Sequence, residues 1–360
     1  MKNTLEIKKF YNKKKILITG VTGFKGAWLA SWLLELGSKV YGIGYNPNQN
    51  RNLFYKLNLN RKIKLKLLDI RNFKKIDNFI KVTKPSIIFH MAAQPLIFDS
   101  YKKPLQTFDI NFRGSLNVLE SARNKKFIKS IVIVTSDKCY ESNNSSKGFK
   151  ESDILGGIDP YSASKSSTEI MTRAYRESFF KQKKNIKGIS TARAGNVIGG
   201  GDWSNKRLIP DCIRSIIKNK KILIRNPNFN RPWQHVLEPL KGYLVLAKKQ
   251  YEKPLKFSSA WNFGTNPNSL TTVKKIVEYI ISFWGSGVLK VKKNRFYEQP
   301  NLQLNIKKAK NELGWTPTYR IKDSVKFTTD WYKQVLSLKQ VPEKVTKDQI
   351  IRYMHDSKIS

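Results

Sequence analysis

Two side chains with acid–base capacity stand four residues apart in the stretch Tyr161-Ser162-Ala163-Ser164-Lys165. Residues four apart lie on one face of a helix, so a helix here would set the phenol of Tyr161 beside the ammonium of Lys165. A nearby positive charge favours the phenolate and would lower the tyrosine pKa toward neutrality, which suits a general base. The same lysine could hold a nicotinamide ribose. The same spacing also occurs in surface Tyr-Lys pairs without a catalytic role. The neighbouring motifs must therefore distinguish the two interpretations.

Three glycines, Gly20, Gly23 and Gly26, stand between an apolar β-prone run and a helical pattern. Missing β-carbons allow a tight turn and let the backbone approach a pyrophosphate at the N-terminus of the helix. Phe24 and Lys25 belong to the same turn. The placement between strand and helix predicts a dinucleotide site at these five residues rather than an ordinary glycine turn.

The acidic residue that such a site normally carries about 20 residues further on is missing. The second predicted strand runs into Gly44-Tyr45-Asn46, which offers no carboxylate to an adenosine ribose. The choice between NAD and NADP therefore stays open. Arg51 could meet a 2′-phosphate, although a solvated loop cation is the simpler interpretation. Asp69 and Ile70, after the third strand, could instead meet the adenine edge.

A third group of reactive side chains follows the apolar run Ser130–Val134, in the order Thr135-Ser136-Asp137-Lys138. Ligands of parallel sheets bind outside the carboxyl ends of the strands. A hydroxyl, a carboxyl and an amine in succession supply several proton carriers there. The alternative interpretation is that these polar residues only solvate the end of a strand.

Strands alternating with helices must position these motifs. Short apolar runs predict strands at residues 15–19, 39–43, 64–68, 86–90, 130–134 and 189–192, and helices are predicted at about 27–34 and 104–124. This alternation predicts right-handed βαβ units and a parallel sheet. The expected fold class is α/β, a Rossmann-type doubly wound parallel sheet with a smaller mixed α/β C-terminal substrate domain.

The rhythm changes after about Asn196, where loop-forming residues and shorter elements appear, followed by a helix at about 271–284. We expect residues 1–195, with about 236–262, to form the dinucleotide-binding domain. Residues 196–235 and 263–340 would form the substrate domain, packed at the carboxyl ends of the strands. Residues 341–360 are expected to be a polar, basic tail.

The composition excludes several classes of protein. The chain carries 68 Lys and Arg against 26 Asp and Glu, a net charge of +42. That balance suggests a polyanionic partner, but the lysines are scattered and accompany many Asn and Ile, which favours compositional bias. Two cysteines, Cys139 and Cys212, and three histidines argue against a disulfide framework or a metal centre. With no apolar run of about 20 residues and no signal-peptide pattern, a cytoplasmic protein is expected, without membrane or nucleic acid as partner.

Together these motifs resemble the extended short-chain dehydrogenase/reductase family of nucleotide-sugar enzymes, from Lys15 to about Tyr319. Within that family, several segments resemble the branch that acts on CDP-glucose. These segments are Gly23–Leu29, His90–Leu96, Thr135–Tyr140, Arg193–Trp203, Arg207–Asp211, Arg231–Val236 and Trp261–Gly264.

The resemblance implies an NAD-dependent dehydration of a nucleotide-linked glucose to its 4-keto-6-deoxy form, supplying deoxysugars for O-antigens. Tyr161 would take the proton of the C4 hydroxyl, and Ser136 would hydrogen-bond the C4 oxygen. Asp137, protonated through burial, would be the acid for the C6 hydroxyl. The dTDP-glucose branch has a glutamate as C5 base where this chain has Lys138. Lys138 could be that base, or it could stabilise the enolate while another group removes the proton.

The resemblance also implies further ligand contacts and an assembly. Cofactor contacts would include Ala92, Ala93 and Gln94, and substrate contacts would include Asn196, Arg207, Leu208, Ile209 and Arg231. No metal is implied. His90 and His235 are expected to be packed structural residues. A homodimer would form through the stretch Arg113–Ser121 and the helix that carries Tyr161.

Two other functions remain possible interpretations of the sequence. One is that of a dehydratase or 4-epimerase for another nucleotide sugar, although simple epimerases of the family lack the acid at the position of Asp137. The other is a nucleic-acid-binding protein on the same fold, motivated by the charge. The trio Tyr161, Lys165 and Asp137 argues against that reading, because a binding module has no use for it. A redox sensor or scaffold has no supporting feature.

Overall fold

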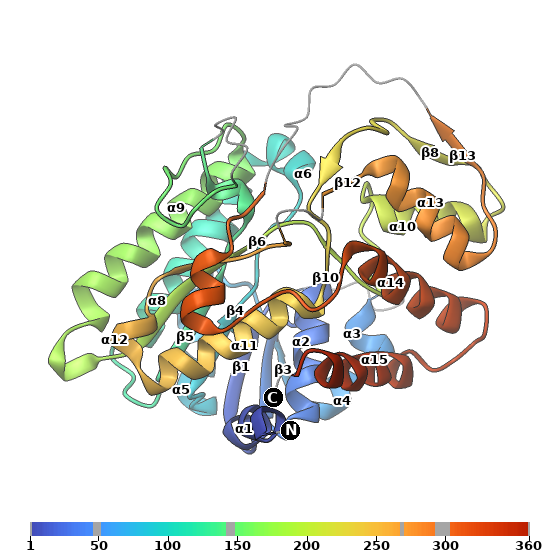
Figure 1. The fold of residues 1–360 in the computed structure, drawn as a ribbon. Coiled ribbons are helices and arrows are strands. Elements are labelled where there is room, and N and C mark those ends of the chain that lie inside the picture. Colours follow the sequence, from blue (N-terminus) through green and yellow to red (C-terminus); the bar gives the residue numbers. More distant parts are fainter. Residues whose placement is uncertain (1, 46–51, 142–147, 267–269, 292–302, 359–360) are drawn as a thin grey trace.

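The structure, a computed structural model, describes residues 2–45, 52–141, 148–266, 270–291 and 303–358. Its centre is a seven-stranded parallel sheet in the order β11-β6-β5-β4-β1-β2-β3 (Figure 1). The strands are β1 Lys15–Thr19, β2 Lys39–Gly44, β3 Lys64–Leu67, β4 Ile87–His90, β5 Ser130–Val134, β6 Gly188–Ala194 and β11 Ala260–Phe263. This order is that of a doubly wound Rossmann sheet, so the predicted fold class is confirmed.

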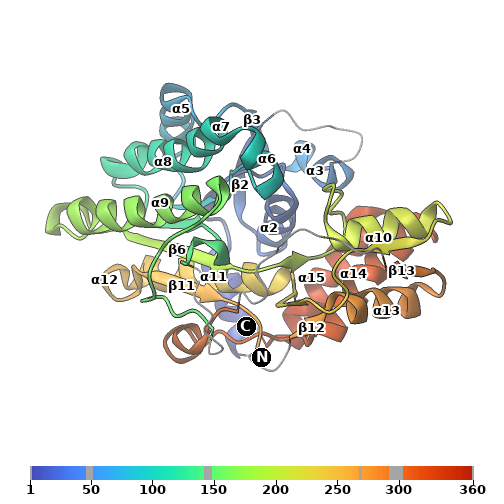
Figure 2. The ribbon, with the colours of Figure 1, turned by 90° about the horizontal axis from the view of Figure 1, so that it is seen from above.

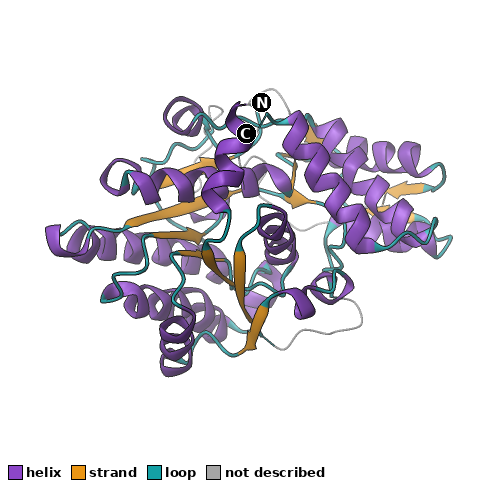
Figure 3. Cartoon of the chain, turned by 90° about the horizontal axis from the view of Figure 1, so that it is seen from below, coloured by secondary structure: helices purple, strands orange, loops and turns teal. Residues whose placement is uncertain are grey.

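Helices cover both faces of this sheet, as the views along it show (Figures 2 and 3). Within β1, Ile16 and Ile18 join the core under one set of helices, while Leu17 joins the core on the opposite face. This alternation follows from the two-residue period of a strand. The first face carries α2 (Phe24–Glu35) and α11 (Leu237–Glu252). The second carries α5 (Phe73–Thr83), α8 (Gly114–Arg123) and α9 (Pro160–Tyr175).

The predicted elements recur with small shifts at their ends. The helix expected at about 104–124 is α7 (Pro104–Phe108) continued through a π-helical turn at Asp109–Arg113 into α8. Shorter helices are α1 Lys2–Tyr11, α3 Leu53–Lys56, α4 Leu59–Lys62, α6 Ile97–Lys102 and α12 Pro254–Phe257. No helix of the described residues is long and apolar enough to cross a membrane.

The remaining elements gather beside the Rossmann sheet (right in Figure 1). Three two-stranded sheets pair β7 Val197–Ile198 with β10 Gln234–His235, β8 Ile222–Ile224 with β13 Leu289–Val291, and β9 Asn230–Arg231 with β12 Thr271–Thr272. The helices here are α10 Leu208–Ile217, α13 Val273–Trp284, α14 Ile321–Leu336 and α15 Pro342–Asp356. A division into two domains at the predicted boundaries remains a proposal.

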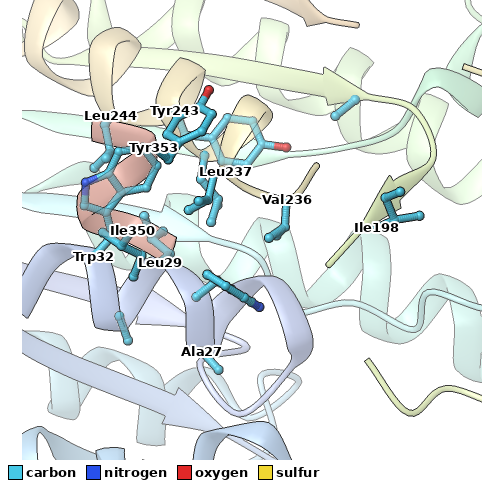
Figure 4. Close-up of a cluster of buried hydrophobic side chains, with 14 of the residues drawn as sticks. Ala27, Leu29, Trp32, Ile198, Val236, Leu237, Tyr243, Leu244, Ile350 and Tyr353 are labelled. Carbon is cyan, nitrogen blue, oxygen red and sulfur yellow. The ribbon is translucent and has the colours of Figure 1, made fainter. Parts of the chain in front are cut away.

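The expected tail is instead the packed helix α15, which corrects the prediction for residues 341–360. Val345, Ile350 and Tyr353 are at most 1% exposed and belong to the main core. The Tyr353 ring meets Trp32 of α2 edge-on at 5.6 Å between centroids, as the close-up of this cluster shows (Figure 4). The Tyr353 hydroxyl donates to Glu238 at 2.7 Å. The helix is polar in overall composition, but its few apolar residues lie on one face, and that face is buried.

Removing the Tyr353 ring should therefore destabilise the whole protein. We expect Tyr353→Ala to lower the free energy of unfolding by about 3–5 kcal/mol, because it leaves a cavity and removes one of the hydrogen bonds to the buried Glu238 carboxylate. Ile351→Ala, on the exposed side of the same helix, should change it by less than about 0.5 kcal/mol. Urea unfolding of both variants measures the difference. Equal midpoints would show that α15 contributes nothing to the core.

Candidate active site

The glycine turn between β1 and α2 can hold a dinucleotide. Gly20 has φ +72°, and a Cβ there would lie 2.7 Å from the backbone nitrogen of Ala92. A Cβ on Gly26 would lie 2.2 Å from the carbonyl oxygen of Gly20. Gly23 caps α2 in an extended conformation and is exposed. The turn thus presents the N-terminus of a 12-residue helix, with its unpaired amides, to an anion. These residues fit a pyrophosphate.

The predicted contacts to the other parts of the cofactor lie along the same edge of the sheet. Ala92, Ala93 and Gln94 follow β4 and are half-buried. The Gln94 backbone amide donates to the Asn111 side chain at 2.8 Å, which ties this loop to the helix beyond it. Arg51 lies outside the described residues.

Asp69 already has a partner in this structure. The Arg71 guanidinium binds both carboxylate oxygens, with distances of 3.0, 3.0 and 2.6 Å. The hydrogen bonds from Arg71 hold the Asp69 pKa below its usual value. Ile70 is buried, and its Cδ1 would lie 2.4 Å from a Cβ on Gly114. The residues that follow β3 are therefore held in place. Their carboxylate, Asp69, is already neutralised by Arg71.

Tyr161 and Lys165 lie on α9, which begins at Pro160 after the N-cap Asp159. Tyr161 is 9% exposed and Lys165 is 5% exposed. Burial raises the pKa of Tyr161 to about 12, while hydrogen bonding with Ser136 works in the opposite direction. The Lys165 ammonium donates to the Val134 carbonyl at 3.3 Å. The structure thus does not show the expected lowering of the tyrosine pKa by Lys165, whose ammonium binds the end of β5.

The proton carriers after β5 form a short 3-10 turn at Asp137–Cys139. The Ser136 hydroxyl donates to Asp137 Oδ1 at 3.0 Å and accepts the Lys138 backbone amide at 3.3 Å. Asp137 is 4% exposed and packs against the residue that follows β6, since a Cβ on Gly195 would lie 3.1 Å from its Oδ2. Lys138 is half-buried. The turn therefore brings Ser136 and Asp137 together and ties both to Tyr161 through the serine.

Three cations share this site with the carboxylate. The charges that act on Lys25 are Arg207, Lys165 and Asp137, so the glycine turn lies close to the candidate residues on α9 and after β5. Burial, followed by the charges of Arg207 and Lys165, lowers the Lys25 pKa to about 8. Arg207 also acts on Tyr161 and pairs with Asp202 at 2.9 Å. The excess of positive charge suits a ligand with a diphosphate.

The other predicted substrate residues lie on the second part of the chain. Asn196 follows β6 and is half-buried. Leu208 and Ile209 open α10 directly after Arg207, and Ile209 is 3% exposed. Arg231 ends β9, where its guanidinium lies 5.7 Å from the Phe229 ring.

The two predicted packing histidines are buried. Burial, followed by the charge of Lys165, lowers the His90 pKa to about 3, and its nitrogens bond Thr19 at 2.7 Å and Ser115 at 2.8 Å. Burial likewise lowers the His235 pKa to about 3. Both rings are therefore neutral near pH 7, as packed residues should be.

Sequence reasoning assigned no role to one buried ion pair behind the site. Glu169, also on α9, pairs with Arg193 of β6 at 2.8 Å, and each side chain is 3% exposed. The available signal was the eight-residue spacing from Tyr161 to Glu169, which keeps the carboxylate on the face of Tyr161 and Lys165.

The fold and the site together define a class, the Rossmann-type dinucleotide-binding enzymes with a tyrosine–lysine pair at the carboxyl end of the sheet. The chain belongs to the GDP-mannose 4,6 dehydratase family, whose sequence model matches residues 17–328. The resemblance to nucleotide-sugar enzymes is thereby confirmed.

Individual relatives agree with this membership. The chain is 42% identical to CDP-glucose 4,6-dehydratase of Salmonella typhimurium over 331 residues, 91% of this chain and 92% of the relative. A crystal structure of dTDP-glucose 4,6-dehydratase from Bacillus anthracis, in complex with NAD, matches with a TM-score of 0.75 and 23% identity, covering 90% and 98% of the two chains. An epimerase from Methanothermobacter thermautotrophicus matches with a TM-score of 0.78 and 21% identity, covering 93% and 96%.

Proposed function

We propose that this protein is an NAD-dependent hydro-lyase that converts CDP-glucose to CDP-4-dehydro-6-deoxy-glucose. The observation that carries the proposal is the buried carboxylate of Asp137, hydrogen-bonded to Ser136 and followed by Lys138, beside Tyr161. The 42% identity to a CDP-glucose 4,6-dehydratase over nearly the full length supports the choice of substrate. The glycine turn and the residues after β4 would hold the cofactor.

NAD, held by the glycine turn and the residues after β4, would supply a reversible hydride acceptor for carbons C4 and C6 of the sugar. The chain supplies the proton transfers. Tyr161 takes the proton of the C4 hydroxyl, and the Ser136 hydroxyl, already in contact with the phenol, orients the C4 oxygen. Because burial raises the Tyr161 pKa to about 12, the phenol needs nearby positive charge to ionise. Lys165 would contribute that charge from the same helix face.

Elimination of water requires an acid at C6 and a base at C5. Asp137 would give its proton to the departing C6 hydroxyl from its buried position beside Gly195. Lys138 would accept the C5 proton. Lys25 and Arg207 place positive charge around Asp137 and would meet the diphosphate of the sugar nucleotide.

Related proteins include epimerases, so the reaction and the base must be tested separately. An epimerase reaction restores the C4 hydroxyl and needs no acid for C6, whereas this chain buries Asp137 among reactive groups. Purified protein should be incubated with CDP-, dTDP-, UDP- and GDP-hexoses and NAD. We expect the alkaline absorbance of a 4-keto sugar with CDP-glucose above all. A 4-epimer without keto sugar would contradict the proposal, and preference for another nucleotide would correct the substrate.

We also propose a homodimer through the helices that flank the site. Apolar side chains remain exposed there, with Leu105 79% exposed on α7 and Ile170 56% exposed on α9. Ile170→Asp should convert a particle of twice the 41.7 kDa chain mass into a monomer in light scattering after gel filtration. Ile217→Asp, at a 47% exposed residue of α10, should leave the dimer intact. A monomeric wild-type protein would contradict this assembly.

A further inference from the structure

A buried hydrogen-bond network around Glu169 lies directly behind the proposed catalytic pair. Glu169 accepts from Thr135 at 2.5 Å, from Thr191 at 2.6 Å and from Arg193 at 2.8 Å. These donors come from the residue after β5 and from β6, so one carboxylate of α9 joins the helix to two strands. The steps proposed above use none of these side chains, and such burial of charge is costly unless every group is paired.

Arg193 connects the same carboxylate to the turn that carries Asp137. Its guanidinium donates to the Tyr140 hydroxyl at 2.6 Å and stands 4.7 Å from the centre of that ring. The Tyr140 hydroxyl in turn donates to Asn262 of β11 at 2.7 Å. Since Tyr140 follows the 3-10 turn directly, the network fixes the backbone on either side of Ser136, Asp137 and Lys138.

Glu169 is also the main negative charge that acts on Lys165. Burial lowers the Lys165 pKa to about 8, and Glu169 and Cys139 oppose that change. Although burial pushes the Glu169 pKa upward, Arg193 and the two threonine hydroxyls bring it below its ordinary value, so the carboxylate is ionised. The charged or titratable groups that face Lys165 are Tyr161 and Glu169 of its own helix, Cys139 of the turn, Lys25 of α2 and His90 of β4, with Arg193 behind Glu169.

We propose that Glu169 is a positioning residue for the reaction, whose pairing with Arg193 sets how much negative charge Lys165 experiences and so keeps that lysine protonated at working pH. The charge of Glu169 favours the ammonium, and the charge of Arg193 limits this effect. The catalytic role of Lys165 rests on the proposed function. The electrostatic relation between the three side chains does not.

The two partners of the pair should therefore move Lys165 in opposite directions. Glu169→Gln removes the negative charge and leaves Arg193 unpaired, which should lower the Lys165 pKa by about one pH unit. Arg193→Gln removes the positive charge that is paired with the carboxylate, which should raise the Lys165 pKa by about one unit. Both variants break the same buried contact, so a purely structural role predicts the same direction, or no change, in both.

The titration is measured on the cofactor-free protein by NMR of the lysine side-chain nitrogens, with the Lys165 signal assigned by its loss in Lys165→Arg. Glu238→Gln is the matched control. It removes another buried carboxylate, which is bonded to Thr318, Tyr319 and Tyr353, and should lower stability without moving the Lys165 titration. The alkaline limb of kcat/KM for CDP-glucose should follow the NMR shifts.

Shifts of opposite sign in the two variants would support the proposal, and Glu169→Asp should restore the wild-type titration in part. Shifts of the same sign, or none, would overturn it, as would an equal shift in Glu238→Gln. If the NMR shifts appear but the wild-type protein forms no keto sugar, the charge relation stands and the proposed function fails. If keto sugar forms while Lys165 does not respond, the reverse holds.

Discussion

Tyr161→Phe should abolish turnover while leaving the protein folded and able to bind NAD. In the proposed mechanism the phenol is the base for the C4 hydroxyl, and general bases contribute roughly 100- to 10,000-fold to rate. We expect kcat for CDP-glucose to fall by about 1,000-fold. The ring stays packed, because only one oxygen is removed from a side chain that is 9% exposed. Stopped assays of keto-sugar formation and titration calorimetry with NAD measure the two quantities.

Tyr279→Phe, on α13, is the control for loss of a phenol and should keep wild-type kcat. Removing the hydrogen bond between Ser136 and Tyr161 should also act on this phenol, since that bond, with the charge of Arg207, opposes the rise that burial causes in its pKa. A Tyr161→Phe variant with kcat within about fivefold of wild type would exclude this tyrosine as the base, given the contribution that such groups make.

The sheet was predictable because its strands carry local signals. Buried parallel strands appear as short apolar runs in the sequence. The bounds of β1 and β5 coincide with the bounds of the two predicted runs. β11 was not predicted as a strand, because Asn262 interrupts the apolar run. Its amide bonds Tyr140 and the Phe149 carbonyl, partners more than 100 positions away in the chain. These long-range hydrogen bonds satisfy the buried amide, and they cannot be deduced from the local sequence.

The site was predictable to the extent that its residues are close in sequence. The i, i+4 pair Tyr161 and Lys165 and the run Ser136–Lys138 are local patterns, whereas Arg193 reaches Glu169 only because β6 packs behind α9. From sequence alone, a Glu or an Arg is expected to be exposed to solvent. Only the tertiary packing shows that these two side chains are buried together. The state of Lys165 also escaped prediction, since helix spacing fixes its face but not the carbonyl to which its ammonium turns.

The identity of the C5 base was left open by the sequence, and the structure adds a second candidate. Lys138 is half-buried, and no hydrogen bond or ion pair is found for its amine among the described residues. Lys25 lies near Asp137, and burial together with the charges of Arg207 and Lys165 lowers its pKa to about 8, which favours the neutral amine that a base needs. Lys25 also lies in the first turn of α2, beside the glycine turn, so its charge would serve to bind the diphosphates rather than to transfer a proton.

Lys138→Met should therefore stop the reaction after C4 oxidation. We expect exchange of the C5 proton with D2O, followed by NMR of the sugar, to fall by about 100-fold or more, while C4 oxidation continues at a rate close to wild type. Lys25→Met is the matched lysine variant. It should weaken binding of NAD and CDP-glucose but retain C5 exchange at saturating concentrations of both. The opposite pattern, with exchange lost in Lys25→Met and kept in Lys138→Met, would transfer the role of base to the glycine turn. If C5 exchange is kept in both variants, neither lysine is the base, because removal of the base must slow the exchange. Both lysines would then act only as electrostatic partners of the enolate.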